Sequence, residues 1–450
     1  MGKQAISKTD GKKITGGARW LVVVLCALMA GNMVYVPFLR YSYYDQMTVL
    51  FTQYRHVVDA SEVNSFIGLF GMGFGIVCTA GYFFGGIFAD KFKEKWLLIL
   101  GGILMGICCI WFGFVPGKTA IIIIHILYGV GTSFMIWSAY LKLTRKMGTG
   151  KEQGRMFSTS EFVRGIFGTL IGFTGVALLG KAALSGGGLD PEILGHQWKI
   201  LHLICGILFF AFAVIIAVLV PSNVIGAEEK NSTVQQKFSM GNVVKVIKMP
   251  GTWMIALLIL CCFSFTSAGN GYIGAYTVNV LGVSETMAST FAIFRNYIIA
   301  AIMTFLIGFV ADKVGSKAKT LAIYLGIATV LAILLIITKN WVVLCIAVSF
   351  VFAIVYSGMR GIYFATLNEV GIPLEMTGIA TGIISVICYL PDVYFAKIAG
   401  YWLDNFGIKG YDYIWIYTIV CGIAGVVVGL ITYKYSLKLI NHRQSDKNNT

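Results

Sequence analysis

The chain has 450 residues, of which 57% are hydrophobic and only 12% charged, and its formal net charge is +15. A water-soluble protein of this length needs a far more polar surface, so the composition indicates a protein embedded in a membrane. Basic loops beside a bilayer meet anionic lipid headgroups, and the positive charge therefore gives no reason to expect a nucleic-acid partner.

Twelve apolar stretches are each long enough to cross the roughly 30 Å hydrocarbon core, which takes about 20 residues. We predict spans at 20–43, 62–88, 96–115, 119–142, 157–180, 200–221, 251–276, 288–311, 320–338, 341–365, 376–403 and 412–435. The first apolar stretch is too long for a cleavable signal peptide, and no small-residue cleavage site follows it. The predicted fold class is an all-α integral membrane protein with twelve transmembrane helices.

A repeated sequence divides these spans into two similar sets. Gly-Ile-Phe-Ala-Asp-Lys at 86–91 returns as Gly-Phe-Val-Ala-Asp-Lys at 308–313, after the second and the eighth span. We predict an N-terminal half at 1–221, a polar central cytoplasmic loop at 222–250 and a C-terminal half at 251–450. Two pseudo-symmetric six-helix halves about a central axis are typical of secondary transporters.

The basic residues predict the orientation. The ends and loops that we place in the cytoplasm hold 24 of the 35 Lys and Arg residues, and the opposite loops hold about seven. This bias predicts a multi-pass protein of the plasma membrane, in a bacterium the inner membrane, with both termini in the cytoplasm.

The sequence offers no arrangement typical of an enzyme or of a metal centre. All ten cysteines lie in predicted spans, and the five histidines form no metal-binding cluster. A phosphate-cradling glycine loop and a nucleophile elbow are both missing, which argues against an ATP-driven pump and against an enzyme. We expect no cofactor, and we expect a gradient to supply the energy.

Arginines inside the spans predict an anionic substrate. Arg164 and Arg295 lie about eight residues, or roughly 12 Å, into their spans. An arginine at the bilayer centre costs at least about 2.5–3.5 kcal/mol, so it needs a partner or a watery cavity. Its planar fork suits a carboxylate, a phosphate or a sulfonate. Glu161, three residues before Arg164, offers an internal ion pair instead, whereas Arg295 has no acidic residue within a turn.

Two further arginines have alternatives of equal weight. Arg40 either contacts substrate or anchors the outer end of the first span, and Arg360 either contacts substrate or pairs with Glu369 near the cytoplasmic end of its span. Coupling of transport to a proton needs a side chain that changes its protonation state within the substrate pathway.

The candidates for proton coupling are Glu161, Asp392 and Glu369, with His125 more simply a packed residue. Asp392 follows Pro391 in mid-span, where the proline frees backbone groups, and its alternative role is a permanent pair with Lys397 or with an arginine across the bundle. Glu369 has a helix-capping role as its alternative.

Six spans in each half, a central loop and Gly-x-x-x-Asp-Lys after spans 2 and 8 resemble the major facilitator superfamily. The resemblance implies that these loops hold the outward-facing state, that the fold is self-sufficient as a monomer, and that the motif residues form a conformational gate. The implied gate residues are Gly86, Asp90, Lys91, Gly308, Asp312 and Lys313. The first copy departs from the family pattern at Lys93 and Glu94, and ordinary solvated turns are the alternative.

A narrower resemblance is to the organophosphate and organic-anion permeases of that superfamily. It is carried by Thr-Gly-Ile-Ala-Thr-Gly at 377–382, by Gly-Tyr-x-x-Asp-x-Phe-Gly at 400–407 and by Tyr-Val-Pro-Phe-Leu-Arg at 35–40. It implies a phosphate-binding role for Arg40 and a substrate-facing position for Arg164. The second phosphate-binding arginine of those permeases is missing from span 7. The further candidate substrate contacts are Tyr35, Asn270 and Tyr272.

These observations predict a secondary transporter that moves a small organic anion by alternating access. Arg164 and Arg295 would hold the anion from opposite sides of a midplane site, with a proton or a counter-anion as the coupled ion. Sugar phosphates, sugar acids and sulfonated sugars are the expected substrate classes. The alternatives are a drug/proton exporter, which arginines in the core argue against, and a membrane sensor that binds an anion without transporting it.

Overall fold

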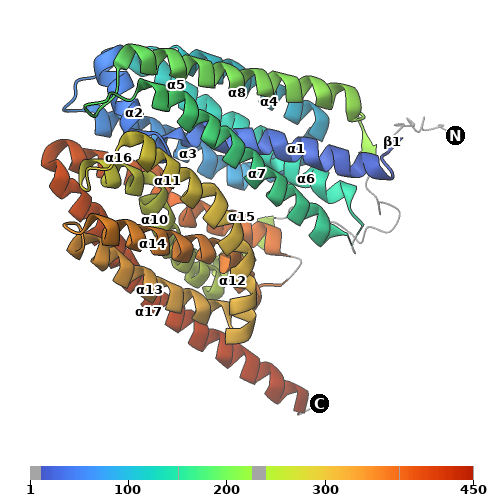
Figure 1. The fold of residues 1–450 in the computed structure, drawn as a ribbon. Helices are drawn as coiled ribbons and strands as arrows, with labels where there is room; N and C mark the ends of the chain where they lie inside the picture. The colour runs from blue at the N-terminus through green and yellow to red at the C-terminus, as the bar shows by residue number, and fades with distance from the viewer. Residues whose placement is uncertain (1–11, 150–151, 226–239, 374–375, 449–450) are drawn as a thin grey trace.

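The computed structural model describes residues 12–149, 152–225, 240–373 and 376–448. Within these residues, twelve helical segments are long and apolar enough to cross a membrane (Figure 1). The predicted all-α membrane fold with twelve spans is confirmed.

The helices of the N-terminal half come first along the chain. They are α1 (Gly17–Tyr35), η1 (Val36–Tyr41), α2 (Tyr44–Val49), η2 (Leu50–Tyr54), α3 (Val63–Lys91), α4 (Glu94–Gly113), α5 (Lys118–Gly129), η3 (Val130–Trp137), α6 (Ser138–Met147), α7 (Gln153–Leu179), η4 (Gly180–Ala182) and α8 (Pro191–Leu219). The sixth span begins well before the predicted residue 200. Pro191 occupies the first turn of α8, and the Asp190 side chain caps that turn by accepting from the backbone N–H groups of Glu192 and Ile193.

The helices of the C-terminal half follow. They are α9 (Met240–Lys248), α10 (Pro250–Asn279), α11 (Glu285–Ile293), η5 (Phe294–Ile299), α12 (Ala300–Val314), α13 (Lys317–Ile337), α14 (Val342–Ile362), η6 (Tyr363–Asn368), α15 (Thr377–Cys388), α16 (Leu390–Phe406) and α17 (Ile408–Asn448). The described part of the predicted central loop thus contains a short helix, α9. The residue limits that we assigned to the halves stay a prediction.

The strand β1 (Lys12–Lys13) and the end of α17 lie on the same side of the molecule, which we call the terminal face; the opposite side is the distal face (Figure 1). On the terminal face the short strand β1 (Lys12–Lys13) pairs in parallel with β2 (Val224–Ile225). Figure 1 shows the two halves meeting at the distal face and diverging toward the terminal face.

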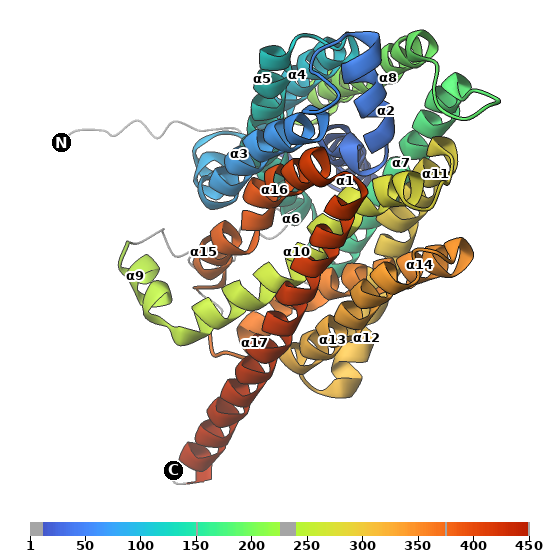
Figure 2. The ribbon, with the colours of Figure 1, turned by 90° about the vertical axis from the view of Figure 1, so that its left-hand side faces the viewer.

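Several helix pairs join the halves, among them α3 with α15 and α10 with α2. The most extensive contact runs between α3 and α16, which lie side by side in Figure 2, and another runs between α7 and α11. Glycines line the α3–α16 and α7–α11 contacts. A Cβ atom at Gly68 would lie 2.3 Å from the carbonyl oxygen of Ala396, and one at Gly172 would lie 2.6 Å from the Ile293 side chain. Small residues let helices approach this closely in a bilayer.

Two spans, one in each half, are broken where the halves meet. In the first span the α-helix gives way at Pro37 to the 3-10 turn η1, in which Phe38 leaves helical geometry (φ −104°, ψ 15°). In the eleventh span α15 ends before Tyr389, and α16 begins with Pro391 in its first turn. Both breaks place polar side chains between the halves.

Candidate functional site

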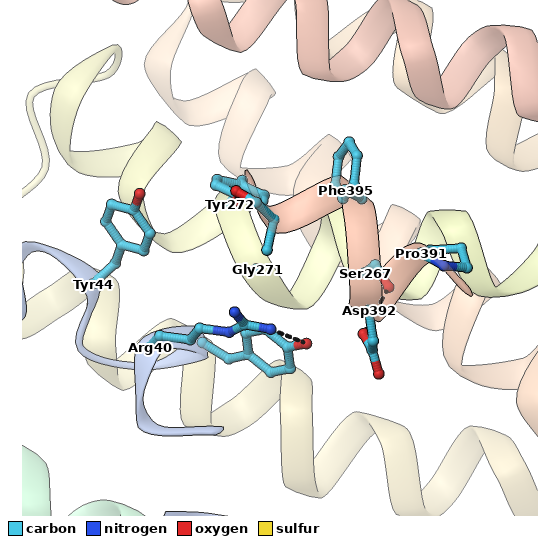
Figure 3. A pocket seen from close by; sticks show the side chains of 10 residues that line it. Arg40, Tyr44, Ser267, Gly271, Tyr272, Pro391, Asp392 and Phe395 are labelled. Atoms are coloured by element: carbon cyan, nitrogen blue, oxygen red, sulfur yellow. Dashed lines mark hydrogen bonds between the residues drawn. The ribbon is translucent and has the colours of Figure 1, made fainter. Parts of the chain in front are cut away.

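A pocket lies where these two breaks face each other (Figure 3). Its lining residues are Arg40, Tyr41 and Tyr44 from the N-terminal half and Ser267, Gly271, Tyr272, Pro391, Asp392, Phe395 and Ala396 from the C-terminal half. One positive and one negative side chain therefore share a small, largely aromatic space at the junction of the halves.

Arg40 is the buried cation of this pocket, with only 6% of its surface exposed. Its Nη2 donates to the Tyr41 hydroxyl at 3.3 Å, and the guanidinium lies 5.0 Å from the centre of the Tyr41 ring. Its Nη1 is buried without a hydrogen-bond partner and lies against Gly71 of α3. Burying a charged group with an N–H donor that lacks an acceptor costs free energy, unless an anion accepts a hydrogen bond from that donor.

Asp392 enters the pocket from the opposite half, in the first turn of α16 (Figure 3). Its Oδ1 accepts a hydrogen bond from the Ser267 hydroxyl at 3.3 Å, and both Arg40 and Arg360 lie within electrostatic range of its carboxylate. The sequence singled out Arg40 and Asp392 separately, and the structure brings them to one pocket.

Arg360, on α14, is exposed in the structure. Glu161 and Tyr82 of the N-terminal half lie within electrostatic range of its guanidinium, as do Tyr363 and Tyr389 of its own half. Arg360 therefore lies near charged groups of both halves, Asp392 in its own half and Glu161 in the other.

Glu369 is engaged elsewhere, at the start of α13. It accepts from the Ser316 hydroxyl at 2.8 Å and from the backbone N–H groups of Lys317 and Ala318. The structure thus forms the capping alternative for Glu369, and its role in proton coupling stays a prediction.

Arg164 and Glu161 form the internal ion pair that their spacing on α7 allows. The Glu161 side chain is 49% exposed and also accepts from the Tyr140 hydroxyl at 3.3 Å, while the Arg164 guanidinium lies 5.8 Å from the Trp137 ring. The structural alternative for Arg164 is therefore present, and substrate contact stays a prediction.

Arg295 lies in different surroundings, inside the C-terminal half. Only 1% of its surface is exposed, its guanidinium lies 5.6 Å from the ring of Phe350, and its Nη1 has no hydrogen-bond partner. Nearby, the Tyr356 hydroxyl donates to Asn270 at 2.7 Å. The structure gives no contact between Arg295 and Arg164, and the prediction that both side chains bind one anion stays untested.

The two remaining tyrosine candidates make buried hydrogen bonds. Tyr272 lines the pocket and donates to the carbonyl oxygen of Ala396 at 3.1 Å. Tyr35 is not among the lining residues. Its hydroxyl lies 3.1 Å from that of Tyr43, which in turn donates to the carbonyl oxygen of Gly172 at 2.6 Å.

The repeated motif lies at those ends of α3 and α12 that reach the terminal face. In the first copy, the surroundings of Gly86 and the side chains of Asp90 and Lys91 lie outside the part of the chain that the structure describes. In the second copy, described with Gly308 and Lys313 in α12, Asp312 accepts from Lys317 at 3.2 Å and is 73% exposed. Gly315 ends the helix with a left-handed φ of 78°. This copy has the geometry of a solvated turn, and its gate role stays a prediction.

Comparison with known proteins identifies the family. The family model described as Major Facilitator Superfamily matches residues 20–396. The chain belongs to the major facilitator superfamily. It is therefore a multi-pass membrane transporter, and the recognition made from its repeated motif is confirmed.

Relatives and solved structures cover nearly the whole of this transporter. It is 26% identical to the inner membrane protein YihN of Escherichia coli K12 over 431 residues (92% of this chain and 96% of that one), and 25% identical to the inner membrane protein YqcE of the same strain over 406 residues (88% and 91%). An inward-facing, unoccupied bacterial homologue of the human lysosomal transporter Spinster superposes with a TM-score of 0.76 at 14% identity, over 94% of this chain and 99% of that one. A D-xylose–proton symporter gives a TM-score of 0.67 at 16% identity, over 93% and 97%. These two structures share the fold.

Sequence reasoning missed most of the residues that line the pocket. Three missed residues contact its charged side chains. Tyr41 supports the Arg40 guanidinium, Ser267 holds Asp392, and Gly71 makes room for Arg40. Tyr41 could have been found as the residue next to Arg40. Gly71 carries no signal of its own, since it is one of 53 glycines in the chain.

Proposed function

We propose that this chain is a secondary active transporter that carries a small organic anion across the membrane by alternating access. The observation that supports the anion is Arg40, a guanidinium more than nine-tenths buried between the halves with Nη1 lacking a partner. Burial without a full set of partners costs free energy, and an anionic oxygen at Nη1 would remove that cost.

The remaining lining narrows the substrate class. Tyr41 offers a hydroxyl group to the oxygen atoms of a ligand, while Tyr44, Tyr272 and Phe395 offer apolar ring surface. This combination suits a compact carbon skeleton beside a carboxylate, phosphate or sulfonate. Sugar phosphates, sugar acids and sulfonated sugars remain the classes that we favour.

Asp392 supports coupling of the anion to a proton. It shares the pocket with Arg40, so an entering anion brings a second negative charge close to its carboxylate. Protonation of Asp392 removes that repulsion, so anion and proton bind more tightly together than separately. Exchange against a counter-anion is the alternative mode of coupling, and an Asp392→Asn variant separates the two because it loses pH-dependent anion binding only in the first case.

We further propose that the terminal face is cytoplasmic and that the structure is an inward-facing state. The excess of basic residues in the loops of that face supports the orientation. The hydrogen bonds that join the halves at the distal face, such as Asn279 to Asp45 at 2.7 Å, support a closed outer side.

The first test is ligand-dependent thermal stabilisation of the purified protein by anionic and neutral sugars. A ligand at 100 times its dissociation constant adds about 2.7 kcal/mol to the folded state. We expect one anion class to stabilise the protein, and Arg40→Ala and Arg360→Ala to abolish the effect. Arg55→Ala is the matched control, because Arg55 is exposed and lies over the Tyr54 ring outside the pocket.

Three outcomes decide the proposal. Stabilisation that survives in Arg40→Ala and Arg360→Ala but disappears in Arg164→Ala and Arg295→Ala would move the site to the pair chosen from the sequence. Stabilisation by neutral or cationic compounds alone would overturn the proposal that the substrate is an anion. Binding without flux in proteoliposomes would favour the anion sensor over the transporter.

A further inference from the structure

The seam between α3 and α16 ends at the distal face in an aspartate that caps a helix of the other half. Asp404 Oδ1, on α16, accepts from the backbone N–H of Asn64 at 3.1 Å and from its side-chain amide at 2.9 Å. Its Oδ2 accepts from the backbone N–H of Ser65 at 2.7 Å. Both backbone groups belong to the first turn of α3.

These hydrogen bonds have the chemistry of a helix N-cap. The first N–H groups of a helix have no partner within the helix and carry its partial positive charge, so a carboxylate there is stabilising. A capping side chain ordinarily precedes its own helix, as Asp190 does for α8. Asp404 instead caps α3 across the boundary between the two halves.

The surrounding seam holds the backbones close enough for this contact. A Cβ atom at Gly400 would lie 2.2 Å from the carbonyl oxygen of Asn64, so glycine is needed there for α16 to approach α3. The Lys397 ammonium also reaches the carbonyl oxygen of Ser65, at 3.5 Å. Opening of the distal face has to separate the first turn of α3 from α16 and break these contacts together.

We propose that Asp404 is the latch of the distal gate, a residue that sets the balance between the two states of the transport cycle by capping α3 in only one of them. When the distal face opens, Asp404 and the two N–H groups pass into water. Loss of a helix cap changes an equilibrium by about fivefold, so removing Asp404 should raise the ratio of distal-open to distal-closed protein by that factor. This inference rests on the alternating-access part of the proposed function and not on the anion.

The test is hydrogen–deuterium exchange of the full-length purified protein, which needs no substrate. In Asp404→Ala we expect faster exchange at the distal segments 63–70 and 397–405. We also expect slower exchange at the terminal-face segments 155–164 and 377–385, because alternating access closes one face as the other opens. Asn64→Ala removes one of the three hydrogen bonds and should give a smaller change in the same direction at both faces.

Asp190→Ala is the matched control, since it removes an N-cap at the distal face that lies within one half. It should speed exchange at the start of α8 and leave the terminal face unchanged. If Asp404→Ala behaves in the same way, with no slowing at the terminal face, Asp404 is an ordinary cap and the latch is wrong. If Asp404→Ala does not fold, the graded response of Asn64→Ala decides the question by the same criterion. Failure of every anion to bind would overturn the proposed substrate and leave this result intact.

Discussion

Replacing Gly71 by alanine should weaken anion binding strongly without changing any residue that contacts the anion. A Cβ atom at this position would lie 1.5 Å from Arg40 Nη1 and 2.6 Å from its Cζ. Two atoms cannot share that space, and the guanidinium is the flexible partner because it stands at the end of a long side chain. The arginine therefore moves out of the pocket while the backbone of α3 stays in place.

The magnitude follows from the hydrogen bond that the anion would lose. A hydrogen bond to a charged group contributes about 1.5–3 kcal/mol to binding, so its loss makes the dissociation constant roughly 10- to 150-fold larger. The stability of the protein should change little, because alanine favours a helix over glycine by about 0.5–1 kcal/mol and offsets part of the strain.

Gly73→Ala is the control for this prediction. Gly73 lies two residues further along α3, where a Cβ atom would meet only Ile126 at 3.4 Å, an ordinary contact. Anion affinity, measured by isothermal titration calorimetry, should be that of the parent protein in Gly73→Ala and strongly reduced in Gly71→Ala. Equal affinities in the two variants would show that Arg40 does not hold the anion.

Two further predictions concern the ends of the spans. Burial raises the pKa of Asp45 to about 7 from its ordinary value of 3.8, against the opposing hydrogen bond from Asn279. The folded protein therefore binds this proton more tightly than the unfolded chain does, and its stability falls as the pH rises from about 4 to about 7. Between pH 5 and pH 8, the Tm of the parent protein should therefore drop more than the Tm of the Asp45→Asn variant. Glu94, with its side chain 7% exposed, lies 2.9 Å from the Lys146 ammonium, so Glu94→Gln should cost about 1–3 kcal/mol of stability in thermal unfolding. Glu62→Gln, which removes an exposed pair, should cost almost nothing.

The spans and the family could be predicted from the sequence because hydropathy and the repeated motif are local properties. Local spacing also gave one alternative that the structure contains, the Glu161–Arg164 pair three residues apart. Glu369 does cap a helix, but that helix is α13, which begins 52 residues earlier in the chain, and local spacing does not give this contact. The meeting of Arg40 with Asp392 could not be predicted in this way. It depends on which face of a broken helix turns toward the other half, and neither the break at Pro37 nor that at Pro391 fixes this direction alone.

The arrangement of α3 and α16 links the proposed site to the proposed latch. Asn64, which contacts Asp404, precedes Gly71, which contacts Arg40, by about two turns of the same continuous helix. On the opposite side of the seam, α16 carries both Asp392 and Asp404. A change in the distance between these helices at the pocket is therefore transmitted to the distal face by two continuous helices, and no other element has to move.

Such a linkage is reciprocal. An anion that prefers one state shifts the latch, and a change at the latch alters the apparent affinity for the anion by the same factor. Asp404 variants should therefore change anion affinity although the Asp404 side chain lies outside the pocket, and the size of that change measures how differently the two states bind the anion.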